Sequence, residues 1–445
     1  MVEIGDGEGD QPLTAAYARL HPTPYGTFLL SLCVLVGMVE GYDVQAMSLA
    51  APLLARDWQL ASSAIGVLLS ASLIGQVVGG FLLAPLGDKL GRRNAVLCGL
   101  AVAGLSTLGG AYAPGYGSLM VMRFIAGLGL GMALANTITL AMELVPGRWR
   151  TIAVVLVCSG YPLGAAAGAA AVGQLLGTHG VASVFYVGGF STLAALVVCL
   201  LLLPESPVIL VRRAGSQAVL RALLARLGVA VEPSVRLIGE PGPNRSRVAE
   251  LFTPDRRTAT LLLWLLMFAN LSLVFFFVMW LPSLFVSSGL DPRAAIKATS
   301  LFSFSGIVGG LALAFLLPRI GPILTLGGCY AVILLSVWWF AGVAGTGSAF
   351  YVALFFCGFS IVGSQFCLSA VVNLFYPGPI RATGVGFALG AGRVGGVFAP
   401  IVGGVILAHV ASPQFAFYVA LVPAAISLIA LLSLRQLRLV GLQSE

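Results

Sequence analysis

Residues 84–93 read APLGDKLGRR, and this loop lies between two apolar runs, 60–83 and 94–112. Each run matches the roughly 20 apolar residues that a helix needs to cross the hydrocarbon core of a membrane. Four of the ten loop residues are charged, and charged side chains are costly at the centre of a bilayer. The stretch therefore predicts two membrane-spanning helices joined by a basic loop at the membrane surface.

Further apolar runs of spanning length lie before and after this pair. They fall at 27–49, 118–142, 152–176, 183–203, 259–286, 297–317, 323–343, 348–372, 383–407 and 414–434. The chain is 59% hydrophobic and 9% charged over its 445 residues, which is far from the composition of a soluble globular protein. We therefore expect an all-α integral membrane protein with twelve transmembrane helices.

The runs form two sets of six on either side of a polar stretch, 205–258. The sequences PGRWR at 146–150 and PGPIR at 377–381 repeat a P-G-x-x-R pattern after the fourth and the tenth run. Such a repeat indicates two pseudo-symmetric six-helix bundles, an arrangement common among secondary transporters. We expect an N-terminal tail at 1–26, bundles at 27–204 and 259–434, a linker at 205–258 and a C-terminal tail at 435–445. The first tail is acidic and Gly-rich, does not resemble a signal peptide, and is expected to be disordered.

The basic residues predict the orientation of the chain. With a cytoplasmic N-terminus, most Lys and Arg residues fall in cytoplasmic segments, including nine arginines between Arg212 and Arg257 in the linker. The opposite side receives Arg56, Arg293 and Lys297. Positive residues collect on the cytoplasmic side of membrane proteins, so both termini are expected in the cytoplasm of a bacterial-type inner membrane. The same argument explains the net charge of +8 without nucleic-acid binding.

The loop at 84–93 resembles the signature G-x-x-x-D-R-x-G-R-R of the major facilitator superfamily, with Ala84 in place of the first Gly. The PESP at 204–207 and Arg123 followed by glycines at 127, 129 and 131 are further patterns of that superfamily. The resemblance implies a secondary transporter in which Asp88, Arg92 and Arg93 gate the cytoplasmic side. A loop that only sets orientation is the alternative.

Within the superfamily, EGYDVQ at 40–45 resembles the D-G-x-D of the aromatic acid:proton symporters. IRATGVG at 380–386 and GRVG at 392–395 resemble motifs of the same family, and TATLLLW at 258–264 is similar to hydroxyphenylpropionate carriers. The resemblance implies import of an aromatic carboxylate with protons. The sequence GYPLG at 160–164 lacks the G-P-x-x-G-G of proton-coupled drug exporters, which favours uptake.

Three charged residues within two of the spans are candidates for proton coupling. A charge at the bilayer centre costs about 2.5 to 3.5 kcal/mol, so such residues are expected to pair or to line a wet cavity. Glu40 and Asp43 share one helix face, and Arg123 lies at a similar depth, so Asp43 and Arg123 are expected to meet. A buried carboxylate whose pKa falls when an arginine approaches can carry a proton. A permanent ion pair that only fixes packing is the alternative.

Arg393 is the candidate substrate residue, because no acid in the second set of spans can neutralise it. A guanidinium suits bidentate binding of a carboxylate, while backbone carbonyls or Gln365 are the alternative partners. The candidate lining combines aromatic rings with groups for ring hydroxyls: Tyr42, Tyr161, Phe276, Trp280 and Phe366, with Asn136, Gln365 and Ser369. Aromatic residues in spans more often serve packing or face lipid.

At the cytoplasmic ends we expect Glu143 to form gating salt bridges with Arg150 and Arg381, and surface pairing is the alternative. Seven cysteines and three histidines show no ligand spacing, so no metal and no cofactor is expected, and the carrier is expected to be monomeric. Two kinds of rival function remain. One is a proton-coupled exporter, an antiporter or a symporter of another organic acid, and the other is a membrane enzyme or a channel.

Overall fold

The computed structural model describes residues 2–4, 10–13, 23–146, 149–213, 215–231, 235–238, 248–254, 256–342, 347–376, 378–409 and 413–441. The chain divides into two compact units. Unit 1 holds Met1–Asp43, Ile74–Gly164 and Phe185–Pro243, and unit 2 holds Val44–Leu73, Ala165–Val184 and Asn244–Glu445. The long helices that begin in the first half therefore contribute to both units.

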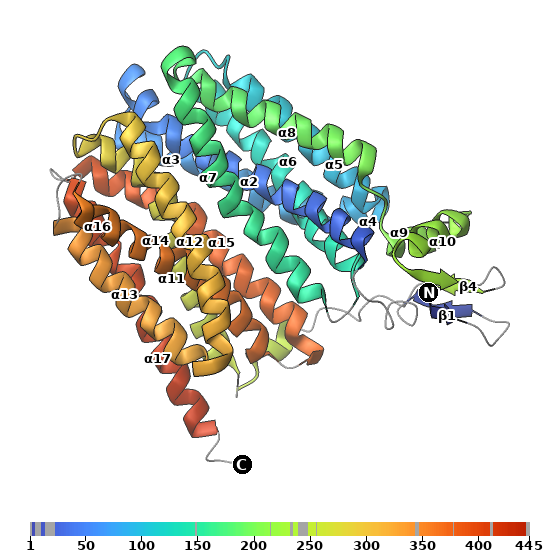
Figure 1. The fold of residues 1–445 in the computed structure, drawn as a ribbon. Coiled ribbons are helices and arrows are strands. Elements are labelled where there is room, and N and C mark those ends of the chain that lie inside the picture. The colour runs from blue at the N-terminus through green and yellow to red at the C-terminus, as the bar shows by residue number, and fades with distance from the viewer. Residues whose placement is uncertain are drawn as a thin grey trace. The chain divides into compact units, whose positions relative to one another are not determined.

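The elements are almost all helices (Figure 1). In the first half they are β1 (Val2–Ile4), β2 (Asp10–Pro12), α2 (Pro24–Asp57), α3 (Ser62–Val78), the π-helical η1 (Gly79–Leu83), α4 (Leu86–Leu90), α5 (Arg92–Gly110), α6 (Tyr116–Glu143), α7 (Arg150–His179), α8 (Ala182–Leu202), α9 (Pro207–Arg212), α10 (Gln217–Arg226), β3 (Val229–Val231) and β4 (Arg236–Ile238). They continue with η3 (Val248–Phe252), α11 (Arg257–Ser287), α12 (Pro292–Ile320), α13 (Pro322–Gly342), α14 (Ser348–Phe375), α15 (Gly378–His409), α16 (Pro413–Val419) and α17 (Leu421–Gly441).

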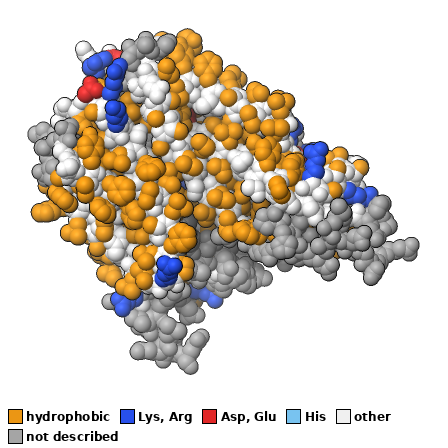
Figure 2. All heavy atoms as spheres, viewed as in Figure 1, with side chains coloured by type: hydrophobic (Ala, Val, Ile, Leu, Met, Phe, Trp, Pro, Cys, Tyr) orange, Lys and Arg blue, Asp and Glu red, His pale blue; other side chains and the backbone are white. Residues whose placement is uncertain are grey.

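Eleven spans within the described chain are long and apolar enough to cross a membrane. They correspond to eleven of the predicted runs. The remaining run, 94–112, forms α5, whose first residues are the polar Arg92, Arg93 and Asn94. Hydrophobic side chains cover most of the face drawn in Figure 2, and the charged side chains that it shows lie in small groups near its margins. Such a surface suits a hydrocarbon environment.

Glycines bring α2 and α7 into close contact in unit 1. A Cβ added at Gly41 would overlap the backbone carbonyl oxygen of Tyr161, and one added at Gly164 would overlap that of Met38. Gly37 and Gly160 approach the partner helix in the same way. Small residues four apart on both helices allow this approach, as is common for membrane helices. The contact fixes the part of α2 that carries Glu40 and Asp43.

The N-terminal tail and the linker contain structure that differs from our expectation. The tail was expected to be disordered, yet β1 pairs in parallel with β3 of the linker, with Val2 opposite Val229. Likewise β2 pairs with β4, with Asp10 opposite Arg236. Within the linker, Ser206 caps α9 by accepting hydrogen bonds from the amides of Val208 and Ile209. The expectation was wrong because strands of three residues are too short to show an alternation of hydrophobic and polar side chains. Their pairing depends on backbone hydrogen bonds to a distant segment.

In unit 2, α11 packs along α15 and α17, and α12 packs along α14. Phe277 stacks on Phe302 with ring centroids 5.8 Å apart, and both rings are fully buried. The first part of α3 also belongs to this unit. There the Ser70 hydroxyl donates to the Val397 carbonyl at 2.8 Å. A Cβ at Gly66 would lie 2.5 Å from the Pro400 carbonyl oxygen, so α3 and α15 approach closely.

Candidate functional site

Asp43 of α2 and Arg123 of α6 form a buried bidentate ion pair in unit 1. Arg123 Nη1 donates to Asp43 Oδ1 at 2.8 Å, and Nη2 donates to Oδ2 at 2.7 Å and to the Asp43 carbonyl at 2.9 Å. The Thr107 hydroxyl of α5 donates to Asp43 Oδ1 at 3.1 Å. Asp43 is 2% exposed and Arg123 is 0% exposed. The predicted contact is confirmed, and a bidentate geometry makes it strong and directional.

The other candidates on α2 and α7 divide into two groups. Tyr161 lies beside Gly41, and its hydroxyl is close enough to Glu40 and Asp43 to interact electrostatically. Glu40 is partly buried. Tyr42 instead points to α8, where a Cβ at Gly188 would lie 2.7 Å from its ring. Glu40 and Tyr161 therefore belong with the ion pair, and Tyr42 packs between helices.

Arg393 of α15 is partly buried, and the residues that follow it on the same face are partly or fully buried. Val397, Pro400 and Gly404 follow it at helical spacing, and these are the residues that α3 contacts. The exposed face of α15, with Val394, lies elsewhere on the helix. Among the described residues the Arg393 guanidinium has no hydrogen bond and no ion pair. The alternative that Gln365 or a backbone carbonyl holds it finds no support in the described contacts.

Gln365 of α14 belongs to a polar cluster in unit 2. Asn270 Nδ2 of α11 donates to Gln365 Oε1 at 2.7 Å, and the Tyr330 hydroxyl of α13 donates to Asn270 Oδ1 at 2.9 Å. A Cβ at Gly392 would lie 3.3 Å from the Met267 carbonyl oxygen, so α15 passes α11 close to Asn270. Gln365 and Arg393 therefore lie beside neighbouring turns of α11.

Three aromatic candidates in unit 2 serve helix packing. Trp280 is 2% exposed, and its indole N–H donates to the Pro400 carbonyl at 3.1 Å. The Phe276 ring also lies against Gly403 of α15, and the Phe366 ring lies against Gly310 of α12. Aromatic runs alone do not distinguish packing from a ligand site, so a role of these rings in binding the solute stays a prediction. The Ser369 side chain lies outside the described residues.

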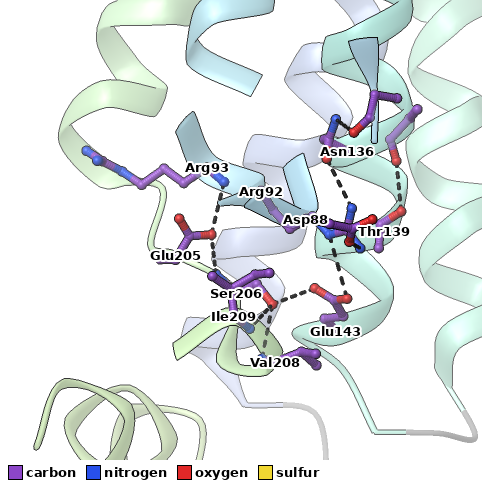
Figure 3. Close-up of polar contacts among 12 residues, drawn as sticks. Asp88, Arg92, Arg93, Asn136, Thr139, Glu143, Glu205, Ser206, Val208 and Ile209 are labelled. Atoms are coloured by element: carbon purple, nitrogen blue, oxygen red, sulfur yellow. Dashed lines mark hydrogen bonds and ion pairs between the residues drawn. The ribbon is translucent and has the colours of Figure 1, made fainter. Parts of the chain in front are cut away.

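A cluster of polar side chains joins α4, α5 and α6 in unit 1, and we call Asp88, Arg92, Asn136 and Glu143 the loop cluster (Figure 3). Arg92 Nη2 lies 2.7 Å from Asp88 Oδ1, Nη1 donates to Asn136 Oδ1 at 3.3 Å, and Nε lies 3.9 Å from Glu143 Oε1. Asn136 Nδ2 also donates to the Ala84 carbonyl. Asn136 was expected near a ring hydroxyl, but its amide is engaged in this cluster.

The PESP segment binds to the same end of the unit. The Ser206 hydroxyl donates to Glu143 Oε2 at 2.5 Å. Glu205 Oε1 accepts hydrogen bonds from the amides of Arg93 and Ser206 at 3.1 and 2.9 Å (Figure 3). Arg93 is the second residue of α5, where a carboxylate satisfies a free N–H and complements the helix dipole. The Arg93 guanidinium donates to the carbonyls of Leu203 and Leu200.

The expected salt bridges of Glu143 take a different form. The ion-pair contact found for Glu143 among the described residues is with Arg92. Arg150 is exposed and is not within ion-pair distance of Glu143 in this part of the chain, but its charge is close enough to attract the Glu143 carboxylate. The Arg381 side chain, together with Gly147, Arg148 and Pro377 of the repeated P-G-x-x-R motif, lies outside the described residues.

The glycine of the loop motif makes the loop cluster possible. A Cβ at Gly87 would overlap Asn136 Oδ1. Replacing Gly87 with alanine is therefore expected to displace the Asn136 amide from Arg92 and to destabilise the protein by about 1–3 kcal/mol, as overpacking does. Thermal denaturation of the purified protein measures the loss. Gly117→Ala is the matched control, because nothing lies within 4 Å of a Cβ there. Equal stability of the two variants would contradict the role given to Gly87.

Comparison with known proteins identifies the class to which this fold belongs. The family model described as Major Facilitator Superfamily matches residues 33–372. The chain therefore belongs to the major facilitator superfamily, a family of membrane transporters. The expected twelve-helix fold is confirmed, and the chain is a multi-pass membrane transporter and not an enzyme.

Curated relatives narrow the resemblance. The chain is 32% identical to a gallate transporter of Pseudomonas putida, over 91% of this chain and 89% of the relative. It is 34% identical to the 3-(3-hydroxy-phenyl)propionate transporter of Escherichia coli (strain K12), over 85% and 86%. The inward open structure of the xylose transporter XylE from E. coli superposes with a TM-score of 0.73 at 14% identity, covering 93% of this chain and 96% of that chain. The relatives confirm the resemblance to aromatic acid carriers, and the xylose transporter shows the fold alone.

Several residues of the site were not predicted from the sequence. Thr107, Asn270 and Tyr330 lie in apolar runs, where single hydroxyl or amide side chains are common and carry no local signal. Glu205 was recognised as part of the PESP motif, but no partner was predicted for it. Its position directly before a serine cap and a proline was the signal that could have placed it at a helix terminus.

Proposed function

We propose that the chain imports an aromatic carboxylate of the benzoate, hydroxybenzoate or phenylpropionate type by proton symport with alternating access. The observation that carries the proposal is Arg393. It is a partly buried guanidinium in a membrane-spanning helix, with no acid or hydrogen-bond partner among the described residues. A carboxylate is the group that a guanidinium binds in bidentate fashion. The named relatives carry gallate and 3-(3-hydroxy-phenyl)propionate, which supports an aromatic acid.

Proton coupling is assigned to the Asp43–Arg123 pair, with Glu40 and Tyr161 beside it. An aromatic acid is an anion at neutral pH, and moving it into a negative cytoplasm costs about 2.3 kcal/mol per 100 mV. A proton carried with it removes that cost. Protonation of Asp43 would weaken the pair and release Arg123. The buried bidentate contact can therefore be formed in one conformation of the carrier and broken in another.

The loop cluster and the PESP segment are assigned to the cytoplasmic gate. Arg92 contacts Asp88, Asn136 and Glu143, while Glu205 joins the start of α5 to α9. These contacts connect α4, α5, α6 and α9 by charged groups at one end of unit 1. The Asp88 side chain is 54% exposed, and an ion pair that reaches the surface in this way is exchanged easily for water when the end opens. Asp88, Arg92, Arg93 and Glu143 are therefore proposed as gating residues.

The close contact of α3 with α15 is assigned to closure of the outer side. A Cβ at Gly404 would lie 2.5 Å from the Ser62 carbonyl oxygen. Gly404→Leu is expected to keep the two helices apart, so that solute binding persists while transport falls at least about tenfold, since about 1.4 kcal/mol of overpacking in one state suffices. Gly386→Leu on the same helix is the control, because a Cβ there meets nothing within 4 Å. Wild-type transport by Gly404→Leu would rule out this contact as a gate.

Uptake into proteoliposomes tests the function itself. Labelled benzoate, 4-hydroxybenzoate and 3-phenylpropionate are added outside with an inward proton gradient, and we expect accumulation of at least one acid that a protonophore abolishes. An exporter or antiporter would instead lose internal acid when the inward gradient is applied. Accumulation of a non-aromatic acid alone would show a symporter of another class.

A further inference from the structure

A buried polar cluster in unit 2 has no part in the coupling scheme above. Asn270, Tyr330 and Ser364 come from α11, α13 and α14, and each is 0% exposed. Burial of amide and hydroxyl groups is unfavourable unless they are hydrogen-bonded to one another. The cluster therefore has a definite hydrogen-bond arrangement, and that arrangement has a consequence for Gln365.

The two ends of the Asn270 carboxamide have different partners. Its Oδ1 accepts from the Tyr330 hydroxyl at 2.9 Å and lies 3.0 Å from the Ser364 hydroxyl. Ser364 also lies 2.9 Å from the Ile361 carbonyl, so its single proton is shared and Tyr330 supplies the main hydrogen bond. With Oδ1 held in this way, the NH₂ end of Asn270 faces α14 and donates to Gln365 Oε1 at 2.7 Å.

This contact decides which end of the Gln365 amide faces outward. Because its oxygen accepts from Asn270, its NH₂ group is directed away from α11. Gln365 is partly buried whereas Asn270 is fully buried, so Gln365 is the member of the cluster that reaches accessible space. A carboxylate oxygen held by Arg393 can still accept a second hydrogen bond, but Gln365 comes from α14 and Arg393 from α15, and the two helices contact α11 at different residues. The Gln365 donor therefore lies to one side of the carboxylate, where the acceptor that the solute offers is an oxygen on the ring.

We propose, resting on the function proposed above, that Asn270 is a positioning residue that presents the Gln365 NH₂ group to a ring hydroxyl oxygen of the bound acid. Tyr330 orients Asn270, Asn270 orients Gln365, and Gln365 contacts the solute. The carrier then prefers ring-hydroxylated acids to benzoate. The side chains that set this preference lie on α11 and α13 and do not touch the solute themselves.

A double-mutant cycle tests the proposal on the purified full-length protein in nanodiscs. Binding of benzoate, 3-hydroxybenzoate and 4-hydroxybenzoate is measured by calorimetry for wild type, Asn270→Leu, Gln365→Leu and the double variant. We expect wild type to prefer a hydroxylated acid, and each single variant to reduce that preference about five- to tenfold, as loss of one hydrogen bond does. The double variant is expected to lose no more than either single variant, because the two side chains act in series.

Two further variants distinguish the positioning role from a general disturbance of the structure. Tyr330→Phe removes one hydroxyl and is expected to reduce the same preference by a smaller factor. Thr299→Val is the control, because the buried Thr299 hydroxyl donates to the Ala295 carbonyl of its own helix and has no further hydrogen bond among the described residues, and it is expected to leave the preference unchanged. If Asn270→Leu keeps the wild-type preference, or if the two losses add, the positioning role is wrong while aromatic acid binding stands. If wild type binds none of these acids, the proposed function is wrong and this inference falls with it.

Discussion

Replacing Arg123 with leucine is expected to abolish proton-driven uptake and to lower the stability of the protein by about 3–5 kcal/mol. The loss is large because Asp43 is 2% exposed and receives three of its hydrogen bonds from Arg123 and Thr107 side chains. Without Arg123 an uncompensated charge stays buried, or Asp43 holds a proton permanently. Thermal denaturation and uptake of labelled acid, measured on the same preparation, show both effects.

The double variant Asp43→Leu with Arg123→Leu separates stability from coupling. Removing both charges leaves no buried ion behind, and replacement of a buried pair by apolar residues is often neutral or stabilising. We therefore expect near wild-type stability with no proton-driven uptake. Recovery of uptake in the double variant would show that the pair only fixes packing.

Replacing Arg393 with alanine is expected to weaken acid binding by about 2–5 kcal/mol, the range measured when one partner of a charged contact is removed. Unlike replacement of Arg123, replacement of Arg393 should leave the stability of the free protein unchanged, because the Arg393 guanidinium has no partner among the described residues. Arg393→Lys keeps the charge but not the bidentate geometry, so it is expected to bind with intermediate affinity. Calorimetry with 4-hydroxybenzoate measures the three affinities.

A control for Arg393 comes from the same unit. Arg319 lies in the last turn of α12, far along the chain from the proposed site, and Arg319→Ala is expected to bind the acid as wild type does. Arg393→Ala with unchanged affinity, or with a large loss of stability, would mean that Arg393 has a structural role.

The fold could be predicted from the sequence because a bilayer imposes a length and a composition on each span. The loop at 84–93 and the PESP at 204–207 identified the family, and the comparisons confirm it. The strands of the N-terminal tail could not be predicted, because parallel pairing with residues more than 200 positions away depends on backbone hydrogen bonds and not on a side-chain pattern. The proposed domain boundaries remain a prediction.

For the site, charge was the informative property and aromatic character was not. The Asp43–Arg123 contact could be predicted because the sequence places two opposite charges at a similar depth, and a charge in hydrocarbon is stable only when it is paired or hydrated. Trp280 and Phe276 offered no such constraint, since a large ring fits equally well against a glycine of a neighbouring helix or against a solute. The contacts of the Asn136 amide could not be predicted for a related reason, because its partners Arg92 and Ala84 are brought close only by the tertiary fold.

Proton movement caused by the solute is the most direct test of the central claim that Asp43 couples aromatic acid import to protons. The external pH of a weakly buffered proteoliposome suspension is recorded on addition of 4-hydroxybenzoate. We predict a transient alkalinisation with wild type and none with Asp43→Asn, while Asp43→Asn still exchanges labelled for unlabelled acid. An equal alkalinisation with Asp43→Asn would contradict the account.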